Sequence, residues 1–226
     1  MSQIVEMLIA ALSVIVGIVV HESAHAAAAY ALGDDTARSR GRISLNPLNH
    51  IDPFGTIILP LLMIVAGGPV FAFAKPVPIY LNNLKHPKRD EVLVSLAGPA
   101  SNIILAVVAA LLLRALGGGT GLFYMLSNAG LMSLFMNFLL TSIMTNLSLA
   151  FFNLIPLPPL DGSSVIVPFL KGKALQAYYQ IQHYAMPILL VILYILPTVL
   201  HLDLVSLYFQ FTVYPVGDAL LSLALG

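Results

Sequence analysis

The chain has 226 residues, of which 59% are hydrophobic and 9% are charged, and its formal net charge is zero. A soluble domain carries about 25% charged residues, so this composition indicates an integral membrane protein. The balanced charge gives no reason to expect a nucleic-acid partner, and the absence of cysteine excludes disulfides, thiolate metal sites and a cysteine nucleophile.

The first apolar stretch covers residues 4–32, which is long enough to cross a bilayer as a helix. It contains the sequence H-E-S-A-H at residues 21–25. No Lys or Arg occurs in the first 20 residues, so the stretch lacks the basic start of a signal peptide. We therefore expect this helix to be retained.

The next apolar segment, residues 54–73, is broken by Pro60 and by a Gly-Gly-Pro sequence. If it returns to the side that it left, nine of the ten basic residues share one face, and Arg114 alone lies on the other. If it spans, the better orientation gives six against four. Cytoplasmic loops carry excess Lys and Arg, so the count favours a re-entrant segment. A kinked sixth span is the alternative.

Four apolar stretches follow a charged loop, at residues 92–116, 122–154, 184–200 and 204–223. We therefore predict an all-α polytopic membrane protein with about five to six transmembrane helices and a re-entrant, partly β element after the first. Five full spans would place the N-terminus outside and the C-terminus inside. The whole chain, residues 1–226, reads as one membrane-embedded domain, with a catalytic core at about 4–170 and two C-terminal helices at 184–223.

Residues four apart lie on one face of a helix, so His21 and His25 can bind one metal ion, with Glu22 beside it as a candidate general base. Within a membrane span, such a cluster carries a desolvation cost that only a function offsets. The sequence therefore predicts a metal site at mid-membrane depth.

A catalytic zinc takes three protein ligands, so a third His, Asp or Glu is needed. Asp161 stands out because it follows a proline-rich helix break and precedes a glycine. Unwound backbone there could turn its carboxylate back into the bundle. The alternative is an ordinary turn residue at the membrane surface.

Two asparagines are candidates for binding substrate or an oxyanion. Asn102 lies roughly 15 Å into its helix, at a depth similar to that of His21. Asn153 lies eight residues before Asp161, beside the helix break. An interhelical hydrogen bond is the alternative for both. The other four histidines lie in loop or interfacial sequence, and we read them as non-ligands: His50, His86, His183 and His201.

Three stretches together resemble the site-two proteases, zinc metalloproteases that cut substrates inside the membrane. They are the H-E-S-A-H motif, A-G-P-A-S-N at residues 97–102, and N-L-I-P-L-P-P-L-D-G at residues 153–162. The resemblance implies His21, His25 and Asp161 as zinc ligands, Glu22 as the base and Asn153 at the substrate site. The stretch from Gly67 to Pro76 also resembles the membrane-embedded β element of that family. Here the form is compact, without a PDZ or CBS domain.

The expected activity is hydrolysis of peptide bonds within or near transmembrane segments, with one zinc ion per chain. Expected partners are a single-span membrane-protein substrate, the lipid bilayer and a separate regulatory protein. We expect a multi-pass protein of a prokaryotic cell (inner) membrane, with its basic loops cytoplasmic. The alternatives are a divalent-metal-binding membrane transporter, which would be expected to show repeated halves, and an inactive membrane scaffold, which would be expected to lose a motif residue.

Overall fold

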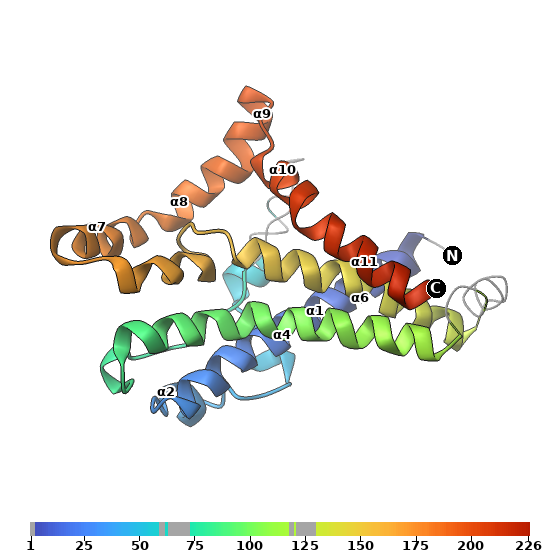
Figure 1. Ribbon diagram of the computed structural model, residues 1–226, viewed down its shortest axis with the longest axis horizontal. Coiled ribbons are helices and arrows are strands. Elements are labelled where there is room, and N and C mark those ends of the chain that lie inside the picture. Colours follow the sequence, from blue (N-terminus) through green and yellow to red (C-terminus); the bar gives the residue numbers. More distant parts are fainter. Residues whose placement is uncertain (1–2, 59–61, 63–72, 118–119, 121–129) are drawn as a thin grey trace.

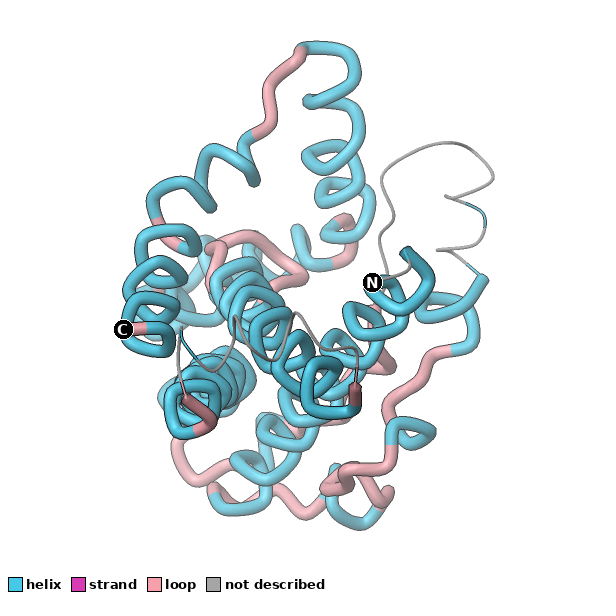
Figure 2. Tube along the Cα trace, turned by 90° about the vertical axis from the view of Figure 1, so that its right-hand side faces the viewer, coloured by secondary structure: helices cyan, strands magenta, loops and turns pink. Residues whose placement is uncertain are grey.

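The computed structural model describes residues 3–58, 62, 73–117, 120 and 130–226, and every regular element in these ranges is a helix. Three long helices form the body of the molecule: α1 (Gln3–Ala31), α4 (Pro87–Ala115) and α6 (Leu131–Asn153). They pack against one another (Figure 1), and Figure 2 shows the same bundle from the side. Each is apolar and long enough to cross a membrane.

Two bent helical pairs follow the bundle. In the first, α7 (Gly172–Gln182) meets the run of α8 (Ala185–Leu190), η5 (Val191–Ile195) and α9 (Leu196–Leu200) at 70°. In the second, α10 (Leu204–Phe211) meets α11 (Val213–Leu225) at 41°. The described residues thus hold three candidate spans, or up to five if each bent pair crosses once. In Figure 1, α8, α9 and α10 rise as an arm above the bundle.

Short helices occupy the connections between the long ones. They are α2 (Thr36–Ser39), η1 (Pro47–Asn49), η2 (Pro53–Ile58), η3 (Leu81–Asn83) and η4 (Asp161–Phe169). Most of the predicted re-entrant, partly β segment lies outside the described residues. The part of the chain that the structure does describe contains no strand.

Helix α4 begins at Pro87, five residues before the predicted start at Val92. The prediction was wrong because the charged residues 88–91 were read as a loop. Proline suits the first position of a helix, where its missing N–H has no partner to lose. The Asp90 carboxylate also accepts the N–H of His86, at 2.8 Å, and so caps the helix. The charges therefore lie on the first turn of α4.

The buried core lies where α4, α6 and α11 meet. Alanines of α4 let the larger side chains of α6 approach closely, as is usual between membrane helices. Its fully buried members include Ala106, Ala110, Leu113, Met136, Ile143, Leu147 and Val213. The N-terminal part of α1 instead exposes Ile4, Met7 and Leu8, each by more than three fifths. Such an apolar surface suits contact with lipid.

Candidate active site

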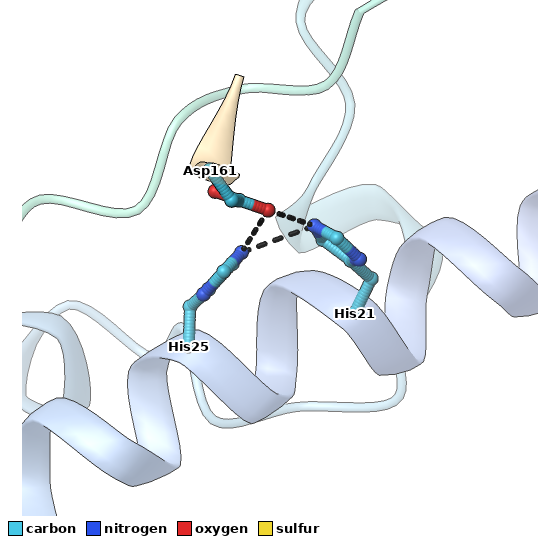
Figure 3. A group of neighbouring side chains, drawn as sticks. All are labelled: His21, His25 and Asp161. Atoms are coloured by element: carbon cyan, nitrogen blue, oxygen red, sulfur yellow. Dashed lines mark hydrogen bonds and ion pairs between the residues drawn. The ribbon is translucent and has the colours of Figure 1, made fainter. Parts of the chain in front are cut away.

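His21, His25 and Asp161 converge on one point (Figure 3). The two histidines lie one turn apart on α1, and Asp161 opens η4, which follows α6 by a short connection. The Nε2 atoms of the histidines are 3.0 Å apart. Asp161 Oδ2 lies 3.1 Å from that of His21 and 3.3 Å from that of His25. Among the described residues, these three form the group that could hold a metal ion.

The hydrogen bonds of Asn102 decide which nitrogen of His21 carries its proton. The Asn102 amide nitrogen faces two oxygens, the Gly17 carbonyl at 3.1 Å and Asn146 Oδ1 at 2.9 Å. A carbonyl can only accept, so this side of the amide must be the NH₂ group. The amide oxygen therefore faces His21 Nδ1, at 2.6 Å, and accepts its proton. Nε2 of His21 is left with a lone pair.

His25 is fixed in the same way, because its Nδ1 lies 2.7 Å from the Val94 carbonyl and donates to it. Nε2 of His21, Nε2 of His25 and Oδ2 of Asp161 thus face one another at about 3 Å, each with a free lone pair. Asp161 Oδ2 is buried and accepts no hydrogen bond from the described residues. A tetrahedral metal with bonds of about 2.0–2.2 Å sets its ligand atoms roughly 3.3–3.6 Å apart. The donor set, two imidazoles and a carboxylate, therefore fits a metal such as zinc.

Two glycines give these side chains their room. A Cβ on Gly98 of α4 would strike Nε2 of both His21 and His25. A Cβ on Gly162 would strike the backbone of Leu154 and Ile155, just past the end of α6. Gly162 therefore allows the chain to fold tightly back after the prolines, and this brings Asp161 to the histidines.

A cavity of about 430 Å³ opens beside the three residues. Glu22 and Asn153 both line it. Glu22 makes no hydrogen bond to the described part of the chain, so its carboxylate is available to a bound molecule. Asn153 donates from its amide nitrogen to the Leu149 carbonyl at 2.9 Å, which leaves its amide oxygen available.

The segment Phe73–Ile79 forms one wall of this cavity. Its first residues are bound to the connection that follows α1. The Phe73 N–H donates to the Gly55 carbonyl at 3.1 Å, and the Phe73 carbonyl accepts from Thr56 Oγ1 at 2.9 Å. The Lys75 N–H donates to the His50 carbonyl at 2.9 Å. The wall is therefore attached along one side, away from the cavity.

The structure brings together five of the six predicted site residues. His21, Glu22, His25, Asn153 and Asp161 all line the cavity. The sixth, Asn102, lies behind His21, and both of its amide hydrogens are engaged there, so it cannot donate to an oxyanion.

Sequence reasoning missed Gly98, because it stood within a motif that was quoted only for its resemblance. The four other histidines lie outside the group of potential ligands.

Comparison with known proteins points to a family of peptidases. The model of peptidase family M50 matches residues 116–196. The chain is 42% identical over 170 residues to the "Putative zinc metalloprotease YwhC" of Bacillus subtilis, and this match covers 74% of the chain and 73% of that protein. The chain belongs to peptidase family M50.

Two relatives of lower identity match a similar share of this peptidase. The Rip2 protein of Mycolicibacterium smegmatis is 32% identical over 173 residues, covering 76% of this chain and 61% of its own length. That of Mycobacterium tuberculosis is 32% identical over 186 residues, covering 81% and 65%. This M50 peptidase thus spans less than two thirds of either Rip2 protein. No solved structure matches it.

Proposed function

We propose that this M50 peptidase is an intramembrane zinc endopeptidase that cuts membrane-protein substrates within or near their transmembrane segments. The observation that carries the proposal is the convergence of His21, His25 and Asp161 beside a cavity that also contains Glu22. The two histidines come from a helix that is apolar and long enough to span a membrane. Chemistry at this point of α1 would occur within the bilayer rather than at its surface.

One zinc ion per chain would be held by Nε2 of His21, Nε2 of His25 and a carboxylate oxygen of Asp161. When bound, zinc supplies a Lewis acid that polarises the peptide carbonyl and lowers the pKa of a coordinated water toward 7. The zinc metalloprotease name of YwhC supports this choice of metal. Asn102 and the Val94 carbonyl hold the two imidazole rings in the required orientation.

Glu22 is the proposed general base. It accepts a proton from the attacking water while the water oxygen bonds to the peptide carbonyl carbon, and it then delivers that proton to the leaving amine as the carbon–nitrogen bond breaks. Its place beside His21 and its freedom from hydrogen bonds within the described chain suit this role. Asn153 is proposed to bind the substrate backbone through its amide oxygen.

A helical substrate hides its carbonyls in its own hydrogen bonds, so it must unwind before it is cut. The wall Phe73–Ile79 is proposed to receive the unwound segment by strand pairing. The N–H groups of Phe73 and Lys75 donate to the connection that follows α1, on the side of this wall away from the cavity. Because neighbouring residues of an extended chain point their backbone groups in opposite directions, those of Ala74 face the cavity side.

The proposed topology places the basic loops in the cytoplasm of a prokaryotic cell, with residues 54–73 re-entrant. The contact between Phe73 and both Gly55 and Thr56 supports this. A single crossing would separate the two ends of the segment by about 30 Å, whereas these ends lie side by side. A separate regulatory protein and a single-span substrate complete the proposed set of partners.

Metal analysis together with a cleavage assay tests this function. Protein purified in detergent should contain one zinc ion per chain and should cut members of a panel of single-span substrates. His21→Ala, His25→Ala and Asp161→Ala should each lose most of the zinc and the cleavage. A transporter would bind metal without cutting a peptide bond, and full zinc occupancy in Asp161→Ala would remove Asp161 from the ligand set.

A further inference from the structure

Arg42 is a buried arginine close to the proposed active site, with only 4% of its surface exposed. No carboxylate lies within ion-pair distance of it in the described residues. Its guanidinium instead donates to two backbone carbonyls, those of Asn49 and Lys75. Burial lowers the pKa of Arg42, and the negative charge of Glu22 opposes that shift. The side chain nevertheless stays protonated, because the pKa of an arginine lies far above neutral pH. The buried guanidinium of Arg42 therefore holds two segments together through these hydrogen bonds.

The two carbonyls belong to segments with different tasks. Asn49 lies in the connection that follows α1, and this connection is fastened to the motif helix. Ser23, inside the H-E-S-A-H motif, donates to the Ser44 carbonyl at 2.5 Å, and His50 Nε2 lies 2.7 Å from the same oxygen. Lys75 lies in the cavity wall. Arg42 therefore ties the wall to a loop that is itself anchored on the catalytic helix.

The bond to Lys75 completes a one-sided pattern of hydrogen bonds. The N–H groups of Phe73 and Lys75, and the carbonyls of both residues, are bound to the connection that spans residues 42–56. Ala74, between them, makes no backbone hydrogen bond in the described part of the chain, and it lines the cavity. An open N–H and C=O pair in an extended segment is what an added strand requires.

We propose that Arg42 is a positioning residue for the substrate, which acts by holding Lys75 so that the backbone edge at Ala74 faces the cavity at a fixed distance from the metal ligands. This inference rests on the proposed function. Without Arg42, the wall would keep its other bonds but lose the one that fixes the Lys75 carbonyl, so substrate binding should suffer more than zinc binding.

Kinetics of Arg42→Met test this role. Hydrogen bonds from a charged donor stabilise a fixed geometry more than neutral ones do. Losing the two bonds from Arg42 to the Asn49 and Lys75 carbonyls should therefore raise KM about tenfold or more. The value of kcat for bound substrate should change less than about threefold, because no reacting group is altered. Arg42→Lys keeps the charge but cannot span both carbonyls, so its KM should be intermediate. The matched control is Arg40→Met, which removes an exposed arginine of the same connection whose side chain makes no hydrogen bond or ion pair to the described residues.

Cross-linking measures substrate binding without cleavage. The chain has no cysteine, so Ala74→Cys in the Glu22→Gln background can be joined to a single-cysteine, single-span substrate by a disulfide when an oxidant is added. The yield should fall about tenfold when Arg42→Met is added and should stay unchanged with Arg40→Met. Zinc content should remain at one per chain throughout.

Two outcomes would overturn the role of Arg42. One is wild-type KM and cross-linking in zinc-loaded Arg42→Met. The other, if that variant does not fold, is wild-type KM and cross-linking in Arg42→Lys. Failure of the proposed function would be distinct, because the parent protein would then neither cut the substrates nor capture them at Ala74→Cys.

Discussion

His21 Nδ1 lies 2.6 Å from the amide oxygen of Asn102 and donates its proton to it, so Nε2 of His21 faces Asp161 with a free lone pair. Asn102 is fully buried and belongs to a polar chain that joins all three long helices. Its amide donates to Asn146 of α6, whose own amide donates to the Ser142 carbonyl, and Ser142 contacts Ser13 of α1 at 3.2 Å. The orientation of His21, the proposed metal ligand, is therefore set by the packing of α1, α4 and α6.

Replacing Asn102 should weaken metal binding. Groups that orient a metal-bound histidine typically contribute about 10- to 100-fold to affinity, so Asn102→Leu should lower zinc affinity by that factor. Asn102→Asp keeps an acceptor for Nδ1 and should retain more of the affinity. Competition with a chelator measures this. The control is Asn137→Leu, since within the described residues the Asn137 side chain donates to the Ser133 carbonyl of its own helix and to no other group. Wild-type zinc affinity in Asn102→Leu would show that the contact does not orient His21.

Gly98 should tolerate no side chain. A methyl group there meets Nε2 of both histidines, at the atoms proposed to hold the metal. Gly98→Ala should therefore lose most of the bound zinc, and cleavage should fall with it. Gly130→Ala serves as the control, because a Cβ on Gly130 meets nothing within 4 Å. Metal analysis of both purified variants gives the comparison, and a fully occupied zinc site in Gly98→Ala would count against the assigned position of the metal.

Much of this site was predictable from the sequence because its parts are local. The four-residue spacing of His21 and His25 needs only a helix, and the prolines before Asp161 indicate a turn back into the bundle. The depth of a residue along a helix does not tell in which direction around the helix axis its side chain points. Asn102 could thus be placed level with His21 but not behind it.

The role of Arg42 depends on contacts between segments far apart in the chain. Lys75 lies 33 positions from Arg42, and no local pattern reports their hydrogen bond. The same holds for Gly98, which meets histidines of another helix. The start of α4 was missed for a different reason, since its charged first turn resembles a loop in composition.

Asp34 anchors the other end of the cavity wall. It is fully buried at the end of α1, and its carboxylate accepts the Tyr80 N–H at 2.7 Å and the Asn83 amide at 2.9 Å. Burial alone raises the pKa of Asp34. Hydrogen bonds from Thr36, Asn83 and the Tyr80 backbone outweigh it and lower the pKa below its usual value of 3.8. The ionised form is therefore favoured by folding.

The lowered pKa of Asp34 predicts acid sensitivity. Its contribution to stability is present above the unfolded-state pKa and is lost as the pH falls through the lower folded-state pKa. Thermal unfolding in detergent should show wild type more stable than Asp34→Asn at about pH 6, and this difference should shrink toward about pH 3. A difference that stays constant over this range would mean that the charge of Asp34 does not stabilise the fold.

Cysteine labelling tests the topology. Single cysteines at Ser39, Asn82 and Ala174, all exposed and all near basic residues, should react with an impermeant reagent only after permeabilisation. Thr120→Cys, between α4 and α6, should react from outside and serves as the positive control. Reaction at Asn82 in intact cells would mean that residues 54–73 cross the membrane.

The most direct test of the central claim is Glu22→Gln. Glutamine keeps the size of the side chain and its capacity for hydrogen bonds but cannot accept the proton. The variant should retain one zinc per chain and should still bind single-span substrates, while cleavage falls by about 100-fold or more, the usual scale for losing general acid–base catalysis. Cleavage at the wild-type rate by zinc-loaded Glu22→Gln would contradict the assignment of Glu22 as the base and, with it, the proposed mechanism.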